Sequence, residues 1–249
     1  MISVVILTKN NQDKVNNLLI SIDWVDEIVI VDSGSTDKTI EIAKKPSKVK
    51  VFRRGLDSFS SQKNFGMSKC SKDLILFLDS DEIVTKDLKD EILSLNQDKV
   101  KNRAWKIQRE DIFMGRKLNY GETGKASFIR LVSKDSGKWR GKVHEEFVIK
   151  NGVKVVSLQA KIIHNHNITI ENFLDRINFY SDLKANELKI NGVKENFLKM
   201  FLWPMGKFIY NYILKLGFLD GLAGFCLAYL MSWHSFLVRV KLRQLWLEA

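Results

Sequence analysis

Three carboxylates follow directly on a run of five apolar residues. Leu74–Leu78 reads LILFL, and Asp79, Asp81 and Glu82 come next. An unbroken apolar run of this length is typical of a strand that is buried on both faces. The helical pattern that follows (86–95) predicts a strand–loop–helix unit, so the carboxylates are expected at the C-terminal end of the strand, where open α/β sheets bind ligands.

Asp79 and Asp81 are two positions apart, so in an extended chain their side chains point to the same side. Two anions this close repel each other unless a cation lies between or beside them. A hard divalent ion fits, because Mg²⁺ and Mn²⁺ prefer oxygen ligands and are commonly held by one or two carboxylates plus phosphates. The alternative is a solvated turn in which Asp or Ser caps the next helix.

A second acidic strand end lies earlier in the chain. The apolar stretch Glu27–Val31 stops at Asp32, and Gly34 follows within the turn. A glycine at a strand-to-helix turn lets the backbone approach a ligand, and an acidic residue there can accept hydrogen bonds from a ribose or base. Alone this segment also fits a capped turn, but a second acidic strand end in the same sheet favours a nucleotide site.

The pattern along the chain predicts an α/β fold in two parts. Over the first hundred residues, helical patterns alternate with apolar strands at 2–7, 27–31, 49–53 and 74–78. This alternation is typical of a mostly parallel, Rossmann-like sheet with helices on both faces. Short strands with Gly-rich turns then predict a smaller mixed sheet from 105–108, 128–132, 143–148 and 155–158.

Two further residues are candidates for chemistry. Glu145 lies in an aromatic and charged segment (139–147) and could serve as a general base if it reaches the acceptor hydroxyl; the alternative is a surface hairpin with solvated charges. His164 follows an apolar pair at the end of another expected strand. A lone histidine is more often structural than a ligand, but a neutral imidazole suits Mn²⁺.

Charge and cysteine content narrow the classes of partner. The 249 residues carry a formal net charge of +11, which suits nucleic acid, an acidic membrane or phosphorylated substrates. The carboxylate cluster and the lack of a recognised nucleic-acid motif argue against nucleic acid as the main partner. Cys70 and Cys226 are the only cysteines and form no metal-binding spacing, so a reducing compartment is expected.

The C-terminal part is apolar and aromatic. A long amphipathic helix is predicted for Ile170–Ile190, and a polar stretch, Asn191–Lys194, follows it. The span Gly221–Val238 has eighteen residues with no formal charge apart from any on His234, which is marginal for crossing a bilayer. Basic residues on both sides favour helices that lie in the interface, or dip in and return, on the side of an anionic leaflet. The alternative is a soluble helical cap.

Together these segments resemble the family 2 glycosyltransferases of the GT-A fold. The family resemblance rests on ISVVILTKN at Ile2–Asn10, VDSGSTD at Val31–Asp37 and LDSD at Leu78–Asp81. Three further segments are similar to the lipopolysaccharide-core branch that includes the heptose β-1,4-glucosyltransferases: FMGR at Phe113–Arg116, VHE at Val143–Glu145 and GFLDG at Gly217–Gly221. The resemblance extends along nearly the whole chain.

The resemblance implies a role for each matching residue. Thr8 and Asp32 would hold the uridine of a nucleotide sugar, and Asp79 would lie near the ribose and metal. Asp81 would ligate Mg²⁺ or Mn²⁺ on the diphosphate, with His164 completing the metal site as in some relatives. Glu145 would be the catalytic base.

The sequence departs from the family at one site position. Relatives often have Arg in the segment written here Ser61–Asn64, whereas this chain has Lys63. A lysine can still neutralise the phosphates of a nucleotide sugar, but as a point charge without the bidentate fork of arginine. Donor affinity or geometry is therefore expected to differ.

The implied protein is an inverting, metal-dependent hexosyltransferase of a bacterial cell envelope. Its expected donor is UDP-glucose, and its expected acceptor is a lipid-linked glycan such as the lipopolysaccharide inner core, at the cytoplasmic face of the inner membrane. We expect a GT-A domain at 1–190, with a nucleotide-sugar half (1–100) and an acceptor half (101–190), and a membrane-associating tail at 191–249.

The sequence also fits other functions. One is transfer to another surface glycan, such as a capsule or a lipid-linked oligosaccharide. Another is a non-enzymatic basic module that binds a membrane or nucleic acid. A sugar nucleotidyltransferase would need a Gly-rich N-terminal phosphate loop, which this sequence lacks.

Overall fold

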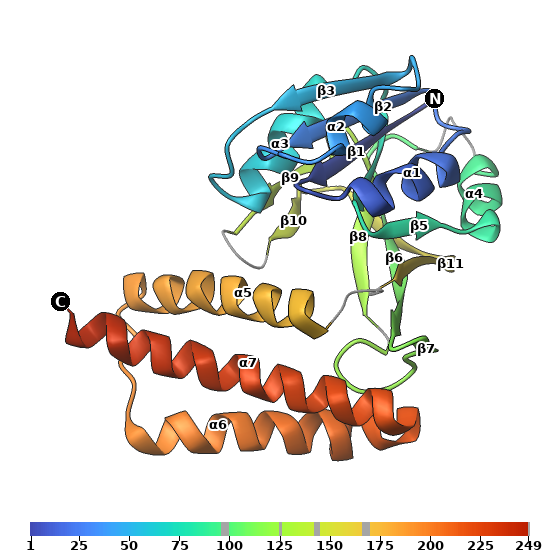
Figure 1. The fold of residues 1–249 in the computed structure, drawn as a ribbon. Coiled ribbons are helices and arrows are strands. Elements are labelled where there is room, and N and C mark those ends of the chain that lie inside the picture. Colours follow the sequence, from blue (N-terminus) through green and yellow to red (C-terminus); the bar gives the residue numbers. More distant parts are fainter. Residues whose placement is uncertain (96–99, 125, 142–144, 166–169, 249) are drawn as a thin grey trace. The chain divides into compact units, whose positions relative to one another are not determined.

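The computed structural model describes residues 1–95, 100–124, 126–141, 145–165 and 170–248 (Figure 1). The chain divides into two compact units. The first combines Met1–Arg109 with Ser127–Asn165, and the second combines Glu110–Ala126 with His166–Ala249. The organisation expected from the sequence, with a boundary after residue 190, stays a prediction.

The first unit is built on the four strands that the sequence predicts near its N-terminus. These are β1 (Ile2–Thr8), β2 (Glu27–Asp32), β3 (Val49–Arg53) and β4 (Leu74–Asp79), and they lie in the order β3-β2-β1-β4. All three pairings within this group are parallel. The expected parallel, Rossmann-like arrangement of these four strands is therefore confirmed.

The sheet continues beyond β4 with antiparallel strands, in the order β8 (Ser127–Ser133), β6 (Arg103–Phe113), β11 (Lys154–Asn165) and β5 (Glu82–Val84). Three of the four strands expected in a smaller mixed sheet (105–108, 128–132 and 155–158) lie in this main sheet instead. Among the described residues the small sheet pairs β9 (Gly137–Arg140) with β10 (Glu146–Ile149) in antiparallel fashion. β8 pairs with the second edge of the buried strand β4, whose backbone groups need hydrogen-bond partners, and β6 and β11 extend the sheet from β8.

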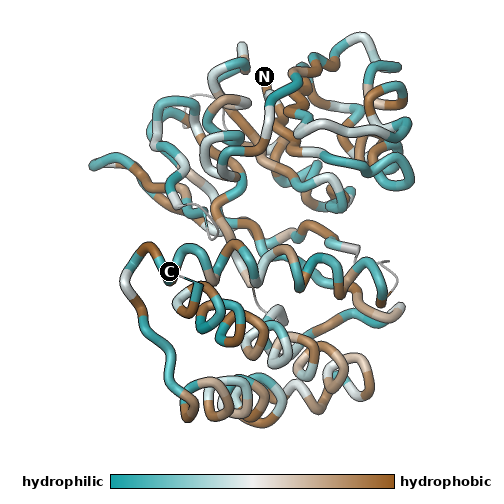
Figure 2. Tube along the Cα trace, turned by 60° about the vertical axis from the view of Figure 1, so that its left-hand side comes forward, coloured by the Kyte–Doolittle hydropathy of each residue, from teal (hydrophilic) through white to brown (hydrophobic). Residues whose placement is uncertain are grey.

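Both faces of the sheet are covered, as the continuous apolar strands predict. Along β4, Leu74, Leu76 and Leu78 belong to one core cluster, whereas Ile75 and Phe77 belong to another. This alternation follows from the two-residue period of a strand. The hydropathy colouring shows apolar strands inside the unit and hydrophilic segments around them (Figure 2).

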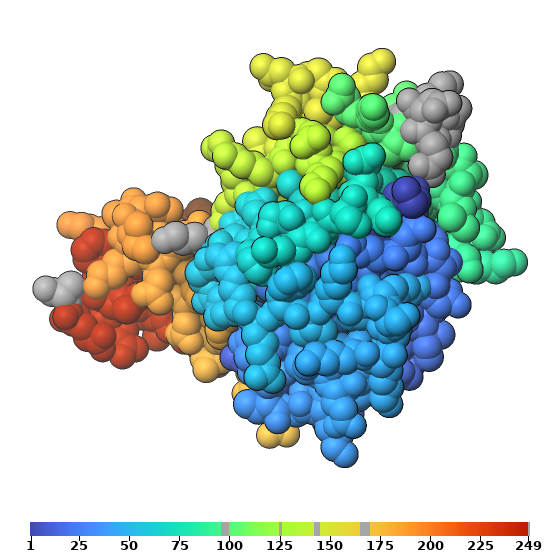
Figure 3. Space-filling model, turned by 90° about the horizontal axis from the view of Figure 1, so that it is seen from above, coloured from blue at the N-terminus to red at the C-terminus, as the bar shows by residue number. Residues whose placement is uncertain are grey.

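Helices and the small sheet complete the two cores. The first cluster includes residues of α1 (Gln12–Ser21), α2 (Thr39–Ala43) and α4 (Lys86–Leu93). In the space-filling view the N-terminal segments form one continuous surface (Figure 3). The second cluster combines α3 (Phe59–Lys69) with β9 and β10. Gly66 lets α3 pack closely on β1, because a Cβ there would overlap the Val5 side chain.

The second unit is mainly helical. It contains β7 (Arg116–Lys117), α5 (Ile170–Ile190), α6 (Phe197–Ile209), the π-helix η2 (Tyr210–Leu214), the 3₁₀-helix η3 (Gly217–Asp220) and α7 (Gly221–Leu247). The predicted bounds of α5 are confirmed. The helix α7 packs against both α5 and α6 (Figure 1). Among the described residues, one helical segment, Gly217–Leu247, is long and apolar enough to cross a membrane.

Glu27 provides a stability test that is independent of the site. Its buried carboxylate accepts hydrogen bonds from Ser3 Oγ at 2.6 Å, Ser71 N at 2.6 Å and Lys50 Nζ at 2.7 Å. Burial favours the protonated form, but these bonds outweigh it and lower the pKa of Glu27 from 4.5 to about 2. The folded protein therefore holds fewer protons than the unfolded chain between these pH values.

We predict that this carboxylate stabilises the fold above pH 4.5 and that the contribution is lost as the pH falls toward 2. Glu27→Gln should lower the free energy of unfolding at pH 7 by about 1–3 kcal/mol, the range for hydrogen bonds to charged groups. Denaturant titrations from pH 7 to pH 2 should show a weaker acid dependence in this variant. Glu41→Gln, at an exposed position on α2, is the control. An unchanged acid profile in the Glu27 variant would contradict the assignment.

Candidate functional site

The C-terminal ends of three parallel strands meet at one edge of the main sheet. Thr8 at the end of β1 pairs in register with Asp32 at the end of β2, and Leu7 pairs with Asp79 at the end of β4. The chain builds β2 and β3 on one side of β1 and then returns to place β4 on the other side. Ligands of open α/β sheets bind at such a switch point, so the structure brings three predicted site residues to the expected place.

The loops after β1 and β2 are bonded to each other. Asn10, which has a φ of 52°, accepts a hydrogen bond from Thr36 N at 2.9 Å and donates its own N–H to Ser35 Oγ at 2.9 Å. Asn11 N donates to Thr39 Oγ1 at 2.7 Å. These bonds give the edge of the sheet a defined backbone shape above Thr8, which is itself 4% exposed.

Asp32 directs its carboxylate into its own loop. The side chain is fully buried, its Oδ1 accepts a bond from Ser35 Oγ at 2.5 Å, and its Oδ2 accepts one from Gly34 N at 3.2 Å. This bonding is that of a capped turn, which was the alternative interpretation of the sequence. In this structure Asp32 therefore holds the shape of the loop around Gly34.

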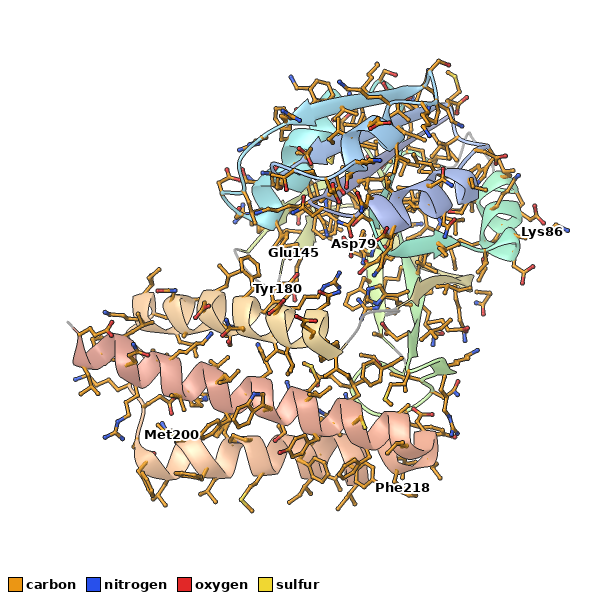
Figure 4. All side chains as sticks on the ribbon, in the orientation of Figure 1. Asp79, Lys86, Glu145, Tyr180, Met200 and Phe218 are labelled. Carbon is orange, nitrogen blue, oxygen red and sulfur yellow. The ribbon has the colours of Figure 1, made fainter. Side chains whose placement is uncertain are left out.

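Lys63 lies at the centre of the candidate site. Its buried Nζ is 2.8 Å from Oε1 of Glu145 and 3.9 Å from Oδ1 of Asp79, and it lies 4.3 Å from the centre of the Trp139 ring. Three residues that the sequence singled out, from α3, β4 and the segment before β10, are thus brought together. Figure 4 labels Asp79 and Glu145, the two carboxylates that this lysine joins. Val143 and His144 of the same predicted motif lie outside the described residues.

Asn64, the neighbour of Lys63, fixes the position of Trp139. Its Oδ1 accepts a hydrogen bond from Trp139 N and its Nδ2 donates to Trp139 O, both at 2.9 Å. This two-bond contact fastens β9 to α3. It therefore keeps the aromatic ring against the Lys63 ammonium, which is attracted to the face of the ring.

A buried arginine that the sequence did not single out bridges two of the three clustered carboxylates. Arg130 Nη2 lies 2.8 Å from Oδ2 of Asp79 and 2.7 Å from Oε1 of Glu82. Oε2 of Glu82 also accepts a bond from Asp79 N at 2.9 Å. These contacts tie β8 to the turn between β4 and β5, so they fix the carboxylates at the sheet edge.

The protonation of this cluster follows from burial and from the shared arginine. Burial favours neutral Asp79, but Arg130 and Lys63 outweigh it and hold the pKa of Asp79 below its usual range. Burial raises the pKa of Glu82, and Arg130 offsets this only in part. Burial opposes the charge on Arg130, yet Asp79 and Glu82 raise the pKa of Arg130 above its ordinary value.

Asp81 meets His164, the other predicted metal ligand. The two strands β5 and β11 pair with Glu82 opposite His164, and this register sets His164 Nε2 at 3.3 Å from Asp81 Oδ1. Both side chains are 8% exposed. Within the described parts of the chain, no three His, Cys, Asp or Glu side chains cluster as a complete metal site. One carboxylate and one imidazole do suit a Mn²⁺ or Mg²⁺ ion whose other ligands come from a diphosphate and water.

The missed residues left only weak signals in the sequence. Arg130 is a charged residue in the middle of an otherwise apolar strand, and such a residue needs a buried partner. Glu82 is visible as the third carboxylate after the apolar run. Nothing in the sequence indicates that Arg130 and Glu82, 48 positions apart, would pair.

Comparisons with known proteins agree with this architecture. The family model described as Glycosyl transferase family 2 matches residues 3–134. An uncharacterized glycosyltransferase of Rickettsia typhi is 28% identical and covers 100% of this chain and 88% of its own length. The lipopolysaccharide core biosynthesis glycosyltransferase LpsC of Rhizobium meliloti is 25% identical over 98% of this chain and 92% of its own length.

Solved structures with a related arrangement have low sequence identity to this chain. Staphylococcus aureus TarS in complex with UDP is 16% identical, with a TM-score of 0.49, over 98% of this chain and 91% of that chain. Glucosyl-3-phosphoglycerate synthase of Mycobacterium tuberculosis, in complex with Mn²⁺, UDP and glucosyl-3-phosphoglycerate, is 16% identical, with a TM-score of 0.46, over 79% of this chain and 81% of that chain.

We predict that removing the shared arginine destabilises the fold strongly. Arg130→Met leaves the buried Glu82 and the partly exposed Asp79 without their main counter-charge, and breaking a buried pair such as Arg130–Glu82 costs about 3–5 kcal/mol. Denaturant unfolding at pH 7 measures the loss. Lys106→Met removes one positive charge from an exposed position on the neighbouring strand β6 and is the matched control.

The double variant Arg130→Met/Glu82→Gln separates charge from packing. Since it also removes one of the two unpaired carboxylates, it should be more stable than Arg130→Met alone. Should Arg130→Met lose no more stability than Lys106→Met, the arginine would not be what holds the carboxylate cluster.

Proposed function

The chain belongs to glycosyl transferase family 2, and we propose that it transfers a hexose, in the first place glucose, from a UDP-sugar to a lipid-linked acceptor with inversion at the anomeric carbon. It is a glycosyltransferase with a GT-A fold. The name of the Rhizobium relative, which aligns over almost the whole chain, supports an acceptor in the lipopolysaccharide core, and we propose the inner core.

In this proposal the nucleotide binds at the ends of β1, β2 and β4. Thr8 and the loop that Asp32 shapes hold the uridine, and Asp79 lies toward the ribose. Lys63 faces the diphosphate. Two observations support these roles. The strand register brings Thr8, Asp32 and Asp79 to one sheet edge, and Lys63 Nζ lies 3.9 Å from Asp79 Oδ1.

Asp81 and His164 would hold a Mg²⁺ or Mn²⁺ ion. When bound, such an ion stabilises the negative charge that the diphosphate gains as it leaves. The Lys63 ammonium adds to this stabilisation as a preorganised charge in a site largely shielded from water. The support for the metal is the 3.3 Å contact between one oxygen and one nitrogen donor in an almost buried setting.

Glu145 is the proposed base. In a direct displacement the acceptor oxygen forms a bond to the anomeric carbon, the bond from that carbon to the diphosphate oxygen breaks, and the proton of the acceptor hydroxyl passes to Glu145. No second carboxylate is needed as a nucleophile. The observation that carries the proposal is the 2.8 Å contact between Glu145 and Lys63, because it joins the proposed base to the group that faces the donor.

The proposed place of the reaction is the cytoplasmic face of a bacterial inner membrane, where a phosphorylated lipid acceptor resides. The net charge of +11 and the apolar C-terminal helix support this location. A different surface glycan, such as a capsule or a lipid-linked oligosaccharide, is the second candidate acceptor, because the geometry of the donor site does not depend on the acceptor. Turnover assays with a panel of nucleotide sugars and purified lipid acceptors distinguish these candidates.

We predict that UDP raises the melting temperature of the protein only when Mn²⁺ or Mg²⁺ is present. Since ligand binding to the folded state stabilises it by mass action, saturating UDP and metal should raise the melting temperature by several degrees, roughly 2–3 kcal/mol at a hundred times the dissociation constant. Asp81→Asn should abolish the metal-dependent part. Asp87→Asn, at an exposed position on α4, is the control. A full shift in the Asp81 variant would remove this residue from the metal site.

We predict that Glu145→Gln keeps donor binding but loses most of the transfer activity. A glutamine cannot accept the proton, so turnover should fall by roughly 10²–10⁴-fold, the typical contribution of a general base. The UDP-dependent thermal shift should persist, since the donor groups are intact. The neighbouring Glu146→Gln is the matched control. Wild-type turnover in the Glu145 variant, with a loss in the Glu146 variant, would transfer the role to Glu146.

A further inference from the structure

The segment from α6 to η3 exposes an unusual amount of apolar surface. Thirteen of the 23 residues from Phe197 to Leu219 are large hydrophobic residues with exposed side chains, and Phe197, Leu198 and Leu214 are each at least 66% exposed. Monomeric soluble proteins rarely carry a contiguous apolar patch of this kind unless it binds something. We call the exposed apolar side chains of α6, η2 and η3 the apolar face.

The apolar face occupies one side of α6. Leu198, Leu202 and Met205 recur at helical spacing and are 59–66% exposed, whereas Met200 and Pro204 point the other way and are buried. Figure 4 shows side chains projecting from the side of α6 that faces away from α7, and Met200 on the opposite side. The exposed side is therefore a surface feature of the folded unit.

Contacts with α7 hold α6 in place. The carbonyl oxygen of Pro204 accepts a hydrogen bond from Ser232 Oγ at 2.6 Å, and the Arg239 guanidinium lies 5.2 Å from the centre of the Trp203 ring. At the turn, Gly224 packs so closely on η3 that a Cβ there would overlap the carbonyl oxygen of Gly217. The apolar face is therefore presented by a fixed antiparallel pair of helices.

The charges around the face favour an anionic surface as its occupant. From Phe197 to Leu219 the chain has three lysines, Lys199, Lys207 and Lys215, and no acidic residue, although Lys207 is ion-paired with Glu122 at 3.2 Å. A second copy of the chain in a symmetric dimer would bring these lysines against one another. An anionic bilayer instead offers opposite charge to the lysines and an apolar layer to the leucines and aromatic rings.

The packing of α7 argues against a transmembrane span. This helix contains the uncharged stretch, but α5 lies along it, and Phe173 and Ile177 of α5 pack with Ala223 and Leu227 of α7. Seven of the 21 residues of α5 are charged. Inserting α7 across a bilayer would draw these charges into hydrocarbon or break the α5–α7 packing, and charges within a membrane are costly.

We propose that the second unit docks on an anionic lipid bilayer through the apolar face. In this arrangement α6 lies in the plane of the interface, and α7 packs on the side of α6 that faces away from the bilayer. The inference deepens the proposed function, since it rests on the proposed membrane location and assigns the contact surface. It makes the protein monotopic, with both ends of α7 on one side of the bilayer.

Vesicle flotation with the full chain tests the proposal. The wild type should bind phosphatidylcholine vesicles containing 30% phosphatidylglycerol at least tenfold more tightly than pure phosphatidylcholine vesicles, and 0.5 M NaCl should reduce this difference. Leu202→Glu/Leu214→Glu should lower the partition coefficient at least tenfold, because two charges enter the apolar face. Ile20→Glu/Leu93→Glu places the same charges at exposed apolar positions of the first unit, 63% and 53% exposed, and should change it less than twofold.

Topology is tested with a C-terminal peptide tag on the vesicle-bound protein. External protease should remove the tag completely; a protected fraction would mean that α7 crosses the bilayer and would overturn the proposal. Equal vesicle binding by the two double variants would overturn it too. A lipid-free dimer that only Leu202→Glu/Leu214→Glu dissociates would assign the face to a second copy instead.

The thermal shift with UDP-glucose and Mn²⁺ is measured on every variant, since none of these substitutions touches the donor site. If the wild type does not bind vesicles but keeps its thermal shift with UDP-glucose and Mn²⁺, the docking surface is wrong and the proposed function stands. Vesicle binding without any nucleotide shift would leave the docking surface standing and count against the proposed function.

Discussion

The candidate site depends on one buried guanidinium. Arg130 joins Asp79 to Glu82, and without it the turn between β4 and β5 would gather three acidic side chains, of which Asp81 and Glu82 are almost fully shielded from water. Counting Lys63 and Glu145 as well, four carboxylates (Asp79, Asp81, Glu82 and Glu145) face two basic side chains, which leaves two formal negative charges. A divalent cation would balance such a deficit, whereas a neutral ligand would not.

The parts of the site that follow from local sequence were predictable. The apolar run before Asp79 forms β4 as expected, and parallel neighbours then bring Thr8 and Asp32 to the same edge. Strand ends are set by where an apolar run stops, so a single sequence carries that information. The pairing of Asp81 with His164 was expected only from the family resemblance, yet the two atoms lie within contact distance.

The parts that depend on long-range pairing were not predictable. The sequence could not indicate that β8 would extend the main sheet beside β4, and this register is what brings Arg130 to Asp79. The sequence also could not predict that the Asp32 carboxylate binds its own loop, because a capped turn and a ligand-binding turn use the same residue types. Periodicity reports which face of an element is buried but not which element covers it.

The lysine in place of the family's frequent arginine has a physical consequence for the proposed reaction. At position 63 the cation lies against the Trp139 ring and near two carboxylates that belong to different elements. A planar guanidinium would bind one partner through two parallel bonds, whereas a compact ammonium can divide its three donors among partners that are not coplanar. The Lys63 ammonium therefore joins side chains from α3, β4 and the segment before β10 in one set of contacts, which the planar fork of an arginine would do less readily.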